Sequence, residues 1–184
     1  PSDKRYEPIV GKLCEIPVGP REQRRLIPII TDPYPDPNFG SGAVKITGAH
    51  DFNDYQVAKR GGIPMYALMD EKGTMRSDGK PYAEEVTIAQ AIARGDLACD
   101  EEAISAMNLV PDDYRGLDRF VARERIIADI TAEGNAVMTI NPKAEEEGEK
   151  KLIPFVESKL IMQPFGDRSK VVIEPMLTCL LYTS

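Results

Sequence analysis

The sequence has few of the residues from which many enzymes build their reactive centres. Its 184 residues include a single histidine, His50, and three cysteines that lie far apart without a C-x-x-C pair. One imidazole excludes every mechanism that needs two, and scattered cysteines argue against a disulfide framework or a zinc site. We therefore expect no metal centre, and we expect the reducing cytoplasm to be the compartment of this chain.

Long apolar runs and an excess of positive charge are also missing. The longest apolar stretches are far shorter than the roughly 20 residues that a membrane-spanning helix needs, and no secretory signal opens the chain. We expect no membrane partner. The 23 basic and 30 acidic side chains give a net charge of −7. This balance argues against non-specific binding along duplex nucleic acid, but it does not exclude local binding of one strand end.

The pattern of apolar residues, glycine and proline predicts a mixture of helices and strands. Helices are expected over about 51–60, 84–94, 101–107 and 118–133. Strands are expected at 26–30, 42–47, 137–140, 155–162 and 171–174, with a hairpin over 65–76. We expect the rest of the first thirty residues to be irregular, with 21–25 a solvated loop or, as the minor alternative, a contact for RNA phosphates. No regular β-α-β period occurs, so the predicted fold class is mixed α/β, with a barrel or mixed sheet and helices laid on it.

One stretch, residues 39–55, has the features of a ligand site and reads FGSGAVKITGAHDFNDY. On a strand, Lys45 and Thr47 point to one face, and the chain then turns into a helix whose start carries Asp51 and Asp54. A bare helix start attracts anions, whereas two carboxylates there create a place for a cation. The layout suits a small polar ligand with an amino group, because a primary ammonium offers three donors.

The same residues also have a purely structural interpretation. Asp-x-x-Asp is an ordinary capping arrangement at a helix start, and Lys45 could be a solvated strand residue. His50 then serves as a turn or capping residue. In the interpretation as a ligand site, Phe39 supplies an apolar wall. Spacing alone favours the structural interpretation.

Residues 39–55 closely resemble the editing-domain motif of the bacterial class I valyl-tRNA synthetases. Residues 116–120 with the helix after them, and residues 162–178, are similar to the same family. Leucyl and isoleucyl enzymes share the Gly-x-Gly-Ala and the final Asp-Tyr, but they differ around Lys45-Ile-Thr47. The resemblance covers about residues 12–178.

The resemblance implies a proofreading hydrolase. Valine and threonine are nearly isosteric, and the valyl enzymes are themselves the standard example of a synthetic pocket that rejects such an isostere poorly. A second site must then remove threonine from the valine tRNA. The resemblance assigns substrate binding to Phe39 and to Asp54, which holds the α-ammonium. It assigns catalysis to Lys45, Thr47 and Asp51, with an attacking water positioned by polar groups and a tRNA hydroxyl.

The family also implies partners and a fold. We expect the 3′ end of tRNA(Val), a threonyl ester and the remainder of the synthetase as partners. Editing itself needs no cofactor, whereas ATP and Mg²⁺ serve the full enzyme and are not bound by this fragment. The implied fold is a β-barrel-like editing domain with peripheral helices.

The expected domain organisation is one editing domain over residues 1–178 with a helical insertion at 84–113. The family's leading loop with Thr and Arg is expected to precede Pro1, and residues 179–184 are expected to be a non-native tail, such as an adaptor artefact. Two alternatives stay open. One is the editing domain of an isoleucyl or leucyl enzyme, and the other is a catalytically inactive module that binds the end of a tRNA.

Overall fold

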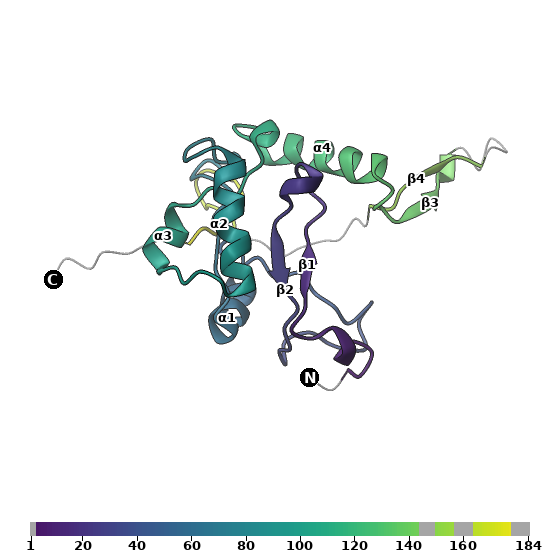
Figure 1. The fold of residues 1–184 in the computed structure, drawn as a ribbon. Coiled ribbons are helices and arrows are strands. Elements are labelled where there is room, and N and C mark those ends of the chain that lie inside the picture. The colour runs from purple at the N-terminus through teal and green to yellow at the C-terminus, as the bar shows by residue number, and fades with distance from the viewer. Residues whose placement is uncertain (1–2, 144–149, 157–163, 178–184) are drawn as a thin grey trace. The chain divides into compact units, whose positions relative to one another are not determined.

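The computed structural model describes residues 3–143, 150–156 and 164–177. The chain divides into two compact units, one formed by Pro1–Leu117 with Glu174–Ser184 and the other by Asp118–Ile173. Both helices and strands occur, as a mixed α/β chain should have (Figure 1). No helix within the described residues is long and apolar enough to cross a bilayer.

The first unit combines one small sheet with three helices and three 3₁₀ turns. Strands β1 (Leu13–Glu15) and β2 (Leu26–Pro28) pair antiparallel with Cys14 opposite Ile27. The helices are α1 (Phe52–Gly61), α2 (Tyr82–Arg94) and α3 (Glu101–Ala106), and the 3₁₀ turns are η1 (Glu7–Ile9), η2 (Arg21–Gln23) and η3 (Asp112–Tyr114). Helix α2 lies against β2, and the Gln90 side chain donates to the Arg24 carbonyl oxygen at 2.7 Å.

The core of this unit is built largely by the helical stretch that the sequence suggested as an insertion. Its buried cluster consists of Tyr82, Val86, Ala89, Met107 and Leu109. The first three recur at helical spacing on one face of α2, which explains why the sequence predicted this helix correctly. Half-buried Tyr66, Leu68, Ile88 and Ile92 complete the cluster.

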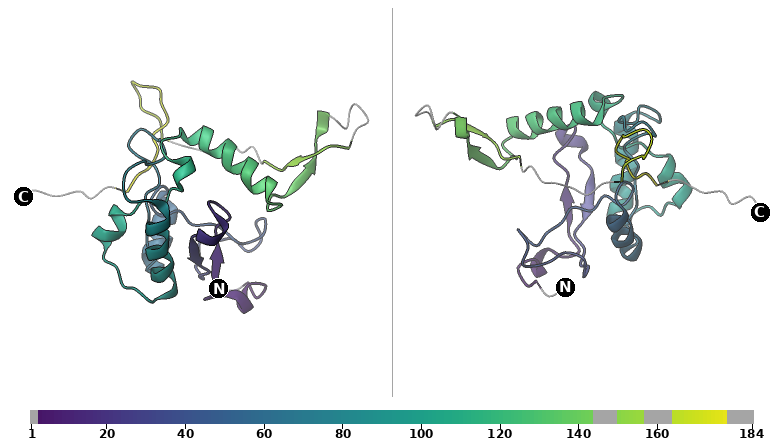
Figure 2. Two further views of the ribbon diagram at one scale, coloured as in Figure 1. Left: turned by 45° about the horizontal axis from the view of Figure 1, so that its top comes forward. Right: turned by 180° about the vertical axis from the view of Figure 1, so that it is seen from behind.

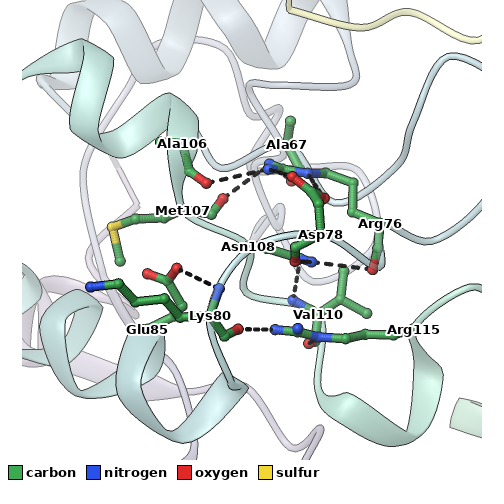
Figure 3. A network of polar contacts seen from close by, with 10 residues as sticks. All are labelled: Ala67, Arg76, Asp78, Lys80, Glu85, Ala106, Met107, Asn108, Val110 and Arg115. Atoms are coloured by element: carbon green, nitrogen blue, oxygen red, sulfur yellow. Dashed lines mark hydrogen bonds and ion pairs between the residues drawn. The ribbon is translucent and has the colours of Figure 1, made fainter.

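A network of hydrogen bonds and ion pairs connects the hairpin to the segment between α3 and η3 (Figure 3). The Arg76 guanidinium donates to the carbonyl oxygens of Ala67, Met107 and Ala106 at 3.1, 3.0 and 3.3 Å, and it pairs with Asp78 at 2.7 Å. Asn108, which is fully buried, donates to the Asp78 carbonyl oxygen at 2.8 Å. One arginine and one asparagine thus satisfy carbonyl groups that would otherwise lie unpaired beside the core.

The second unit contains one long helix and one hairpin. Helix α4 (Arg119–Ala132) starts at Asp118, whose carboxylate accepts from the Phe120 N–H at 2.9 Å. Strands β3 (Met138–Ile140) and β4 (Leu152–Pro154) pair antiparallel with Thr139 opposite Ile153. In every view the hairpin continues past the end of α4 instead of folding back over it (Figure 2).

This unit buries very little apolar surface. Ala122 is the buried hydrophobic residue that the structure records between 118 and 173. Eleven of the twenty large hydrophobic residues recorded as exposed lie in this stretch: Phe120, Val121, Val137, Met138, Ile140, Leu152, Phe155, Val156, Phe165, Val171 and Ile173. The apolar groups of α4 and of the hairpin therefore lack cover within the described chain.

Several strand predictions are wrong. Residues 43–47 form no strand, and the Thr47 N–H donates to the Asp54 side chain instead of to a neighbouring strand. Residues 155–156 are not in a strand either, and most of the stretch predicted at 155–162 lies outside the described residues. The predicted strand at 171–174 is reduced to one bridge, Phe165 with Val172.

The predicted irregular start is interrupted by β1, a strand of three residues that the sequence analysis did not predict. The hairpin prediction is confirmed by the bridge between Met69 and Met75. Among the described residues the sheets are two pairs of strands and not a closed barrel.

Candidate functional site

The predicted site residues meet where the chain enters α1. The Asp54 carboxylate, which is 7% exposed, accepts from the Thr47 N–H at 2.7 Å and from the Thr47 hydroxyl at 2.9 Å. Both bonds go to the same oxygen, Oδ2. The described residues supply no hydrogen bond to Oδ1, so this oxygen remains able to accept from a ligand.

Asp51 has the capping role that the helix start predicted. Its Oδ1 accepts from the N–H groups of Asn53 and Asp54 at 2.8 and 2.9 Å. These bonds satisfy two of the donors that a helix start leaves unpaired. Asp51 also fixes the first turn of α1, and with it the direction in which Asp54 points.

The turn between Thr47 and Asp51 packs closely against the Ala58 and Met65 side chains. A Cβ added at Gly48 would lie 2.8 Å from both the Ala58 Cβ and the Met65 Sδ, so only glycine fits between them. The next residue, Ala49, is buried as well. The polar groups of the site are therefore attached to a rigid turn.

His50 joins three segments of the chain at this turn. Its Nε2 accepts from the Leu68 and Met69 N–H groups at 2.9 and 3.3 Å, and its Nδ1 lies 3.2 Å from the Pro175 carbonyl oxygen. Because Nε2 accepts, Nδ1 carries the proton and donates to Pro175. Burial lowers the pKa of His50, which keeps the ring neutral. The sequence predicted a turn residue and missed this link.

Lys45 lies just before the turn and is exposed, although its ammonium is partly desolvated. That desolvation is the main reason why the pKa of Lys45 is lowered, and the charge of Arg25 lowers it further, whereas Asp54 acts in the opposite direction. Lys45 therefore belongs electrostatically to the same site as Asp54.

Arg25 also belongs to this region, because its charge acts on Lys45. The prediction of a solvated loop at 21–25 is wrong, since Arg21–Gln23 form η2, Arg24 is 8% exposed and Arg25 is half-buried. The Arg25 guanidinium lies over the Tyr66 ring, 5.2 Å from its centre. The sequence feature that could have indicated burial is the position of Arg24 and Arg25, which lie directly before the apolar strand β2.

Phe39 lies on the preceding loop and is 69% exposed. The structure thus gathers Thr47, Asp51 and Asp54 around the start of α1, with the charge of Lys45 coupled to that of Asp54. Within the described stretches no three His, Cys, Asp or Glu side chains are arranged to hold a metal ion.

No protein-family profile matches the chain. It is 66% identical over 187 residues to the valine–tRNA ligase of Ruegeria pomeroyi, a match that covers 97% of this chain and 18% of that protein. It is 39% identical over 178 residues to the valine–tRNA ligase of Rhizorhabdus wittichii, which covers 97% of this chain and 15% of that protein. The chain thus spans less than a fifth of the length of these relatives.

Proposed function

We propose that this chain, which is homologous to a stretch of the valine–tRNA ligases, belongs to such a ligase and forms its proofreading hydrolase. In this proposal the site at the start of α1 removes threonine that has been attached to tRNA(Val) by mistake. The observation that carries it is the half-occupied carboxylate of Asp54. One oxygen is bound by Thr47 and the other is left for a donor.

The free oxygen of Asp54 is suited to the α-ammonium of an aminoacyl ester. An ammonium at neutral pH gives a charge-assisted hydrogen bond to a carboxylate, and this bond fixes one end of the ester. Thr47 holds Asp54 in place, and the rigid turn over Gly48 keeps both from moving. The amino acid would therefore enter in one orientation, which is the main requirement when water attacks the ester.

Lys45 and Thr47 are the groups that we propose to recognise the threonine side chain. The Thr47 hydroxyl gives its proton to Asp54, so its oxygen can accept from the threonine hydroxyl. Lys45 can donate to that same hydroxyl or to the ester. Valine offers no hydroxyl and would leave these polar groups unpaired, which is how a polar site rejects an apolar isostere.

The remaining roles belong to the longer protein. We propose that it uses ATP and Mg²⁺ to join valine to its tRNA, that this chain meets the 3′ end of tRNA(Val), and that the work takes place in the cytoplasm. We also propose that the β1–β2 sheet is part of a β-barrel completed by other strands of the ligase. The exposed side chains of β1 leave room for such neighbours.

The test uses a chimaeric ligase in which residues 1–177 replace the matching stretch of the Ruegeria pomeroyi enzyme. Asp54→Ala removes the charge-assisted bond and should slow the hydrolysis of threonyl-tRNA by roughly 10- to 100-fold. Asp54→Asn keeps an oxygen for Thr47 but loses the charge, so it should be nearly as slow. Asp96→Asn, at an exposed position of the same unit, is the control and should hydrolyse at the parent rate.

Valine activation should remain normal in all three variants, because the proposal assigns it to another part of the ligase. Mischarged threonyl-tRNA should accumulate in the two Asp54 variants alone. Full deacylation by folded Asp54→Ala and Asp54→Asn enzymes would remove the basis of the proposal. If the parent chimaera binds threonyl-tRNA without hydrolysing it, the chain is instead the inactive tRNA-end module.

A further inference from the structure

The Arg25 guanidinium carries a charge that the described chain does not neutralise. Its Nε is buried and has no hydrogen-bond partner within the described residues, and its Cζ lies 5.2 Å from the centre of the Tyr66 ring. Burial of a cation without an anion costs free energy, and a lone aromatic ring offsets only part of that cost. A desolvated arginine of this kind indicates that an anion is missing.

The neighbours of Arg25 do not supply this anion. Tyr66 and Tyr82 flank it, and burial raises the pKa of both phenols, so they stay protonated at neutral pH. Asp54 raises the pKa of Lys45, but no carboxylate is among the groups that shift the pKa of Arg25. Arg25 lies near enough to Lys45 for its charge to lower the pKa of that ammonium, so two cations share this region of a chain whose net charge is −7.

We propose that Arg25 and Lys45 together bind a phosphate group of a nucleotide. The two side chains complement each other: the Arg25 fork is restrained by its contact with the Tyr66 ring, whereas Lys45 is a flexible point charge whose three donors can serve both the ester and the phosphate. The identity of the ligand as the last phosphate of an RNA end rests on the proposed function. The requirement for an anion rests on Arg25 alone.

The experiment measures the binding of adenosine 5′-monophosphate, adenosine and inorganic phosphate to the full 184-residue chain by calorimetry and by the Arg25 Nε–H resonance. The monophosphate should bind at least about tenfold more tightly than adenosine, and inorganic phosphate should compete with it. Arg25→Met, which keeps an apolar side chain over Tyr66, should weaken binding by roughly tenfold or more, and Lys45→Met should weaken it in the same direction.

Lys59→Met is the matched control. Lys59 also lies over a tyrosine, 5.8 Å from the centre of the Tyr55 ring, and it belongs to the same unit. Its loss removes one positive charge without touching the cluster, so the affinity for the monophosphate should not change.

Equal affinity for adenosine and its monophosphate would overturn the proposal, and so would unchanged binding by folded Arg25→Met. If Arg25→Met fails to fold, unchanged binding by Lys45→Met overturns it equally. An affinity lost in both variants and kept in Lys59→Met supports it. The outcome is separate from the deacylation test: a chain that binds phosphate through Arg25 but never hydrolyses threonyl-tRNA disproves only the proposed hydrolase.

Discussion

At the residue scale, His50 shows how one side chain can hold distant segments together. Its ring nitrogens connect the turn before α1 to Leu68 and Met69 on one side and to Pro175 on the other. The bond from the Leu177 N–H to the Ala49 carbonyl oxygen, 3.0 Å long, strengthens the second connection. This arrangement needs a neutral ring, because a protonated Nε2 would point its hydrogen at two N–H donors.

The stability of the chain should therefore fall as the pH drops below about 6.5, the ordinary pKa of histidine. Burial lowers the pKa of His50 in the folded state, so the unfolded chain binds a proton more readily. The stabilisation is fully present above the unfolded pKa and is lost as the pH falls through the folded one. Urea unfolding between pH 5 and 8 should show this slope.

His50→Gln should flatten that slope, because the chain contains no second histidine to titrate in the same range. The glutamine carbonyl can still accept from Leu68. A slope that persists in His50→Gln would assign the pH dependence to other groups.

The sequence predicted local features of the site well and long-range ones poorly. Asp51 as a cap depends only on the residues after it, so spacing was sufficient. The environment of Arg25 depends on Tyr66 and Tyr82, which lie more than forty residues away along the chain. No local pattern reports such a neighbour, and an arginine in a Pro- and Arg-rich start is typical of solvent.

At the scale of elements, the helices were predictable because the residues that start, continue and end a helix lie within it or next to it in the sequence. The periodicity of α2, the cap of α4 at Asp118 and the left-handed Gly62 after α1 all act within a few residues. Strands depend on a partner. Residues 42–47 alternate like a strand, but the Thr47 N–H is bound by Asp54, so no ladder forms there.

Arg76→Met should destabilise the first unit by about 2–4 kcal/mol. Most of the loss comes from carbonyl groups beside the core, at Ala67 and Met107, that lose their donor. The ion pair with exposed Asp78 contributes little. Urea unfolding measures the change.

Arg94→Met, at an exposed position of the last turn of α2, is the control and should cost less than about 1 kcal/mol. Equal losses in both variants would mean that the carbonyl contacts of Arg76 contribute nothing specific.

At the scale of the whole molecule, the two units differ in how much apolar surface they bury. The first contains the cluster around Tyr82 and Val86, whereas the second buries Ala122 and exposes most of its large side chains. Hydrophobic burial is the main source of stability, so the two units should not be equally stable.

Hydrogen exchange on the 184-residue chain should show this difference. Amides in the middle of α2 should exchange at least about tenfold more slowly than those of α4 and of the β3–β4 pair. Equal protection at low concentration would show that the exposed side chains of the second unit are covered after all. Protection that rises with protein concentration would show that another copy of the chain covers them.

The link between His50 and Pro175 also fixes an order of events during synthesis. The contacts that close the first unit around Met75, Gly116 and Leu117 are complete once residue 117 has left the ribosome. The segment 174–177 follows about 60 residues later, which takes roughly 3 to 12 s at ordinary rates of translation. For that time the His50 ring can bind the hairpin but lacks its carbonyl partner. The site would therefore be assembled in two stages, the second waiting for the return of the chain.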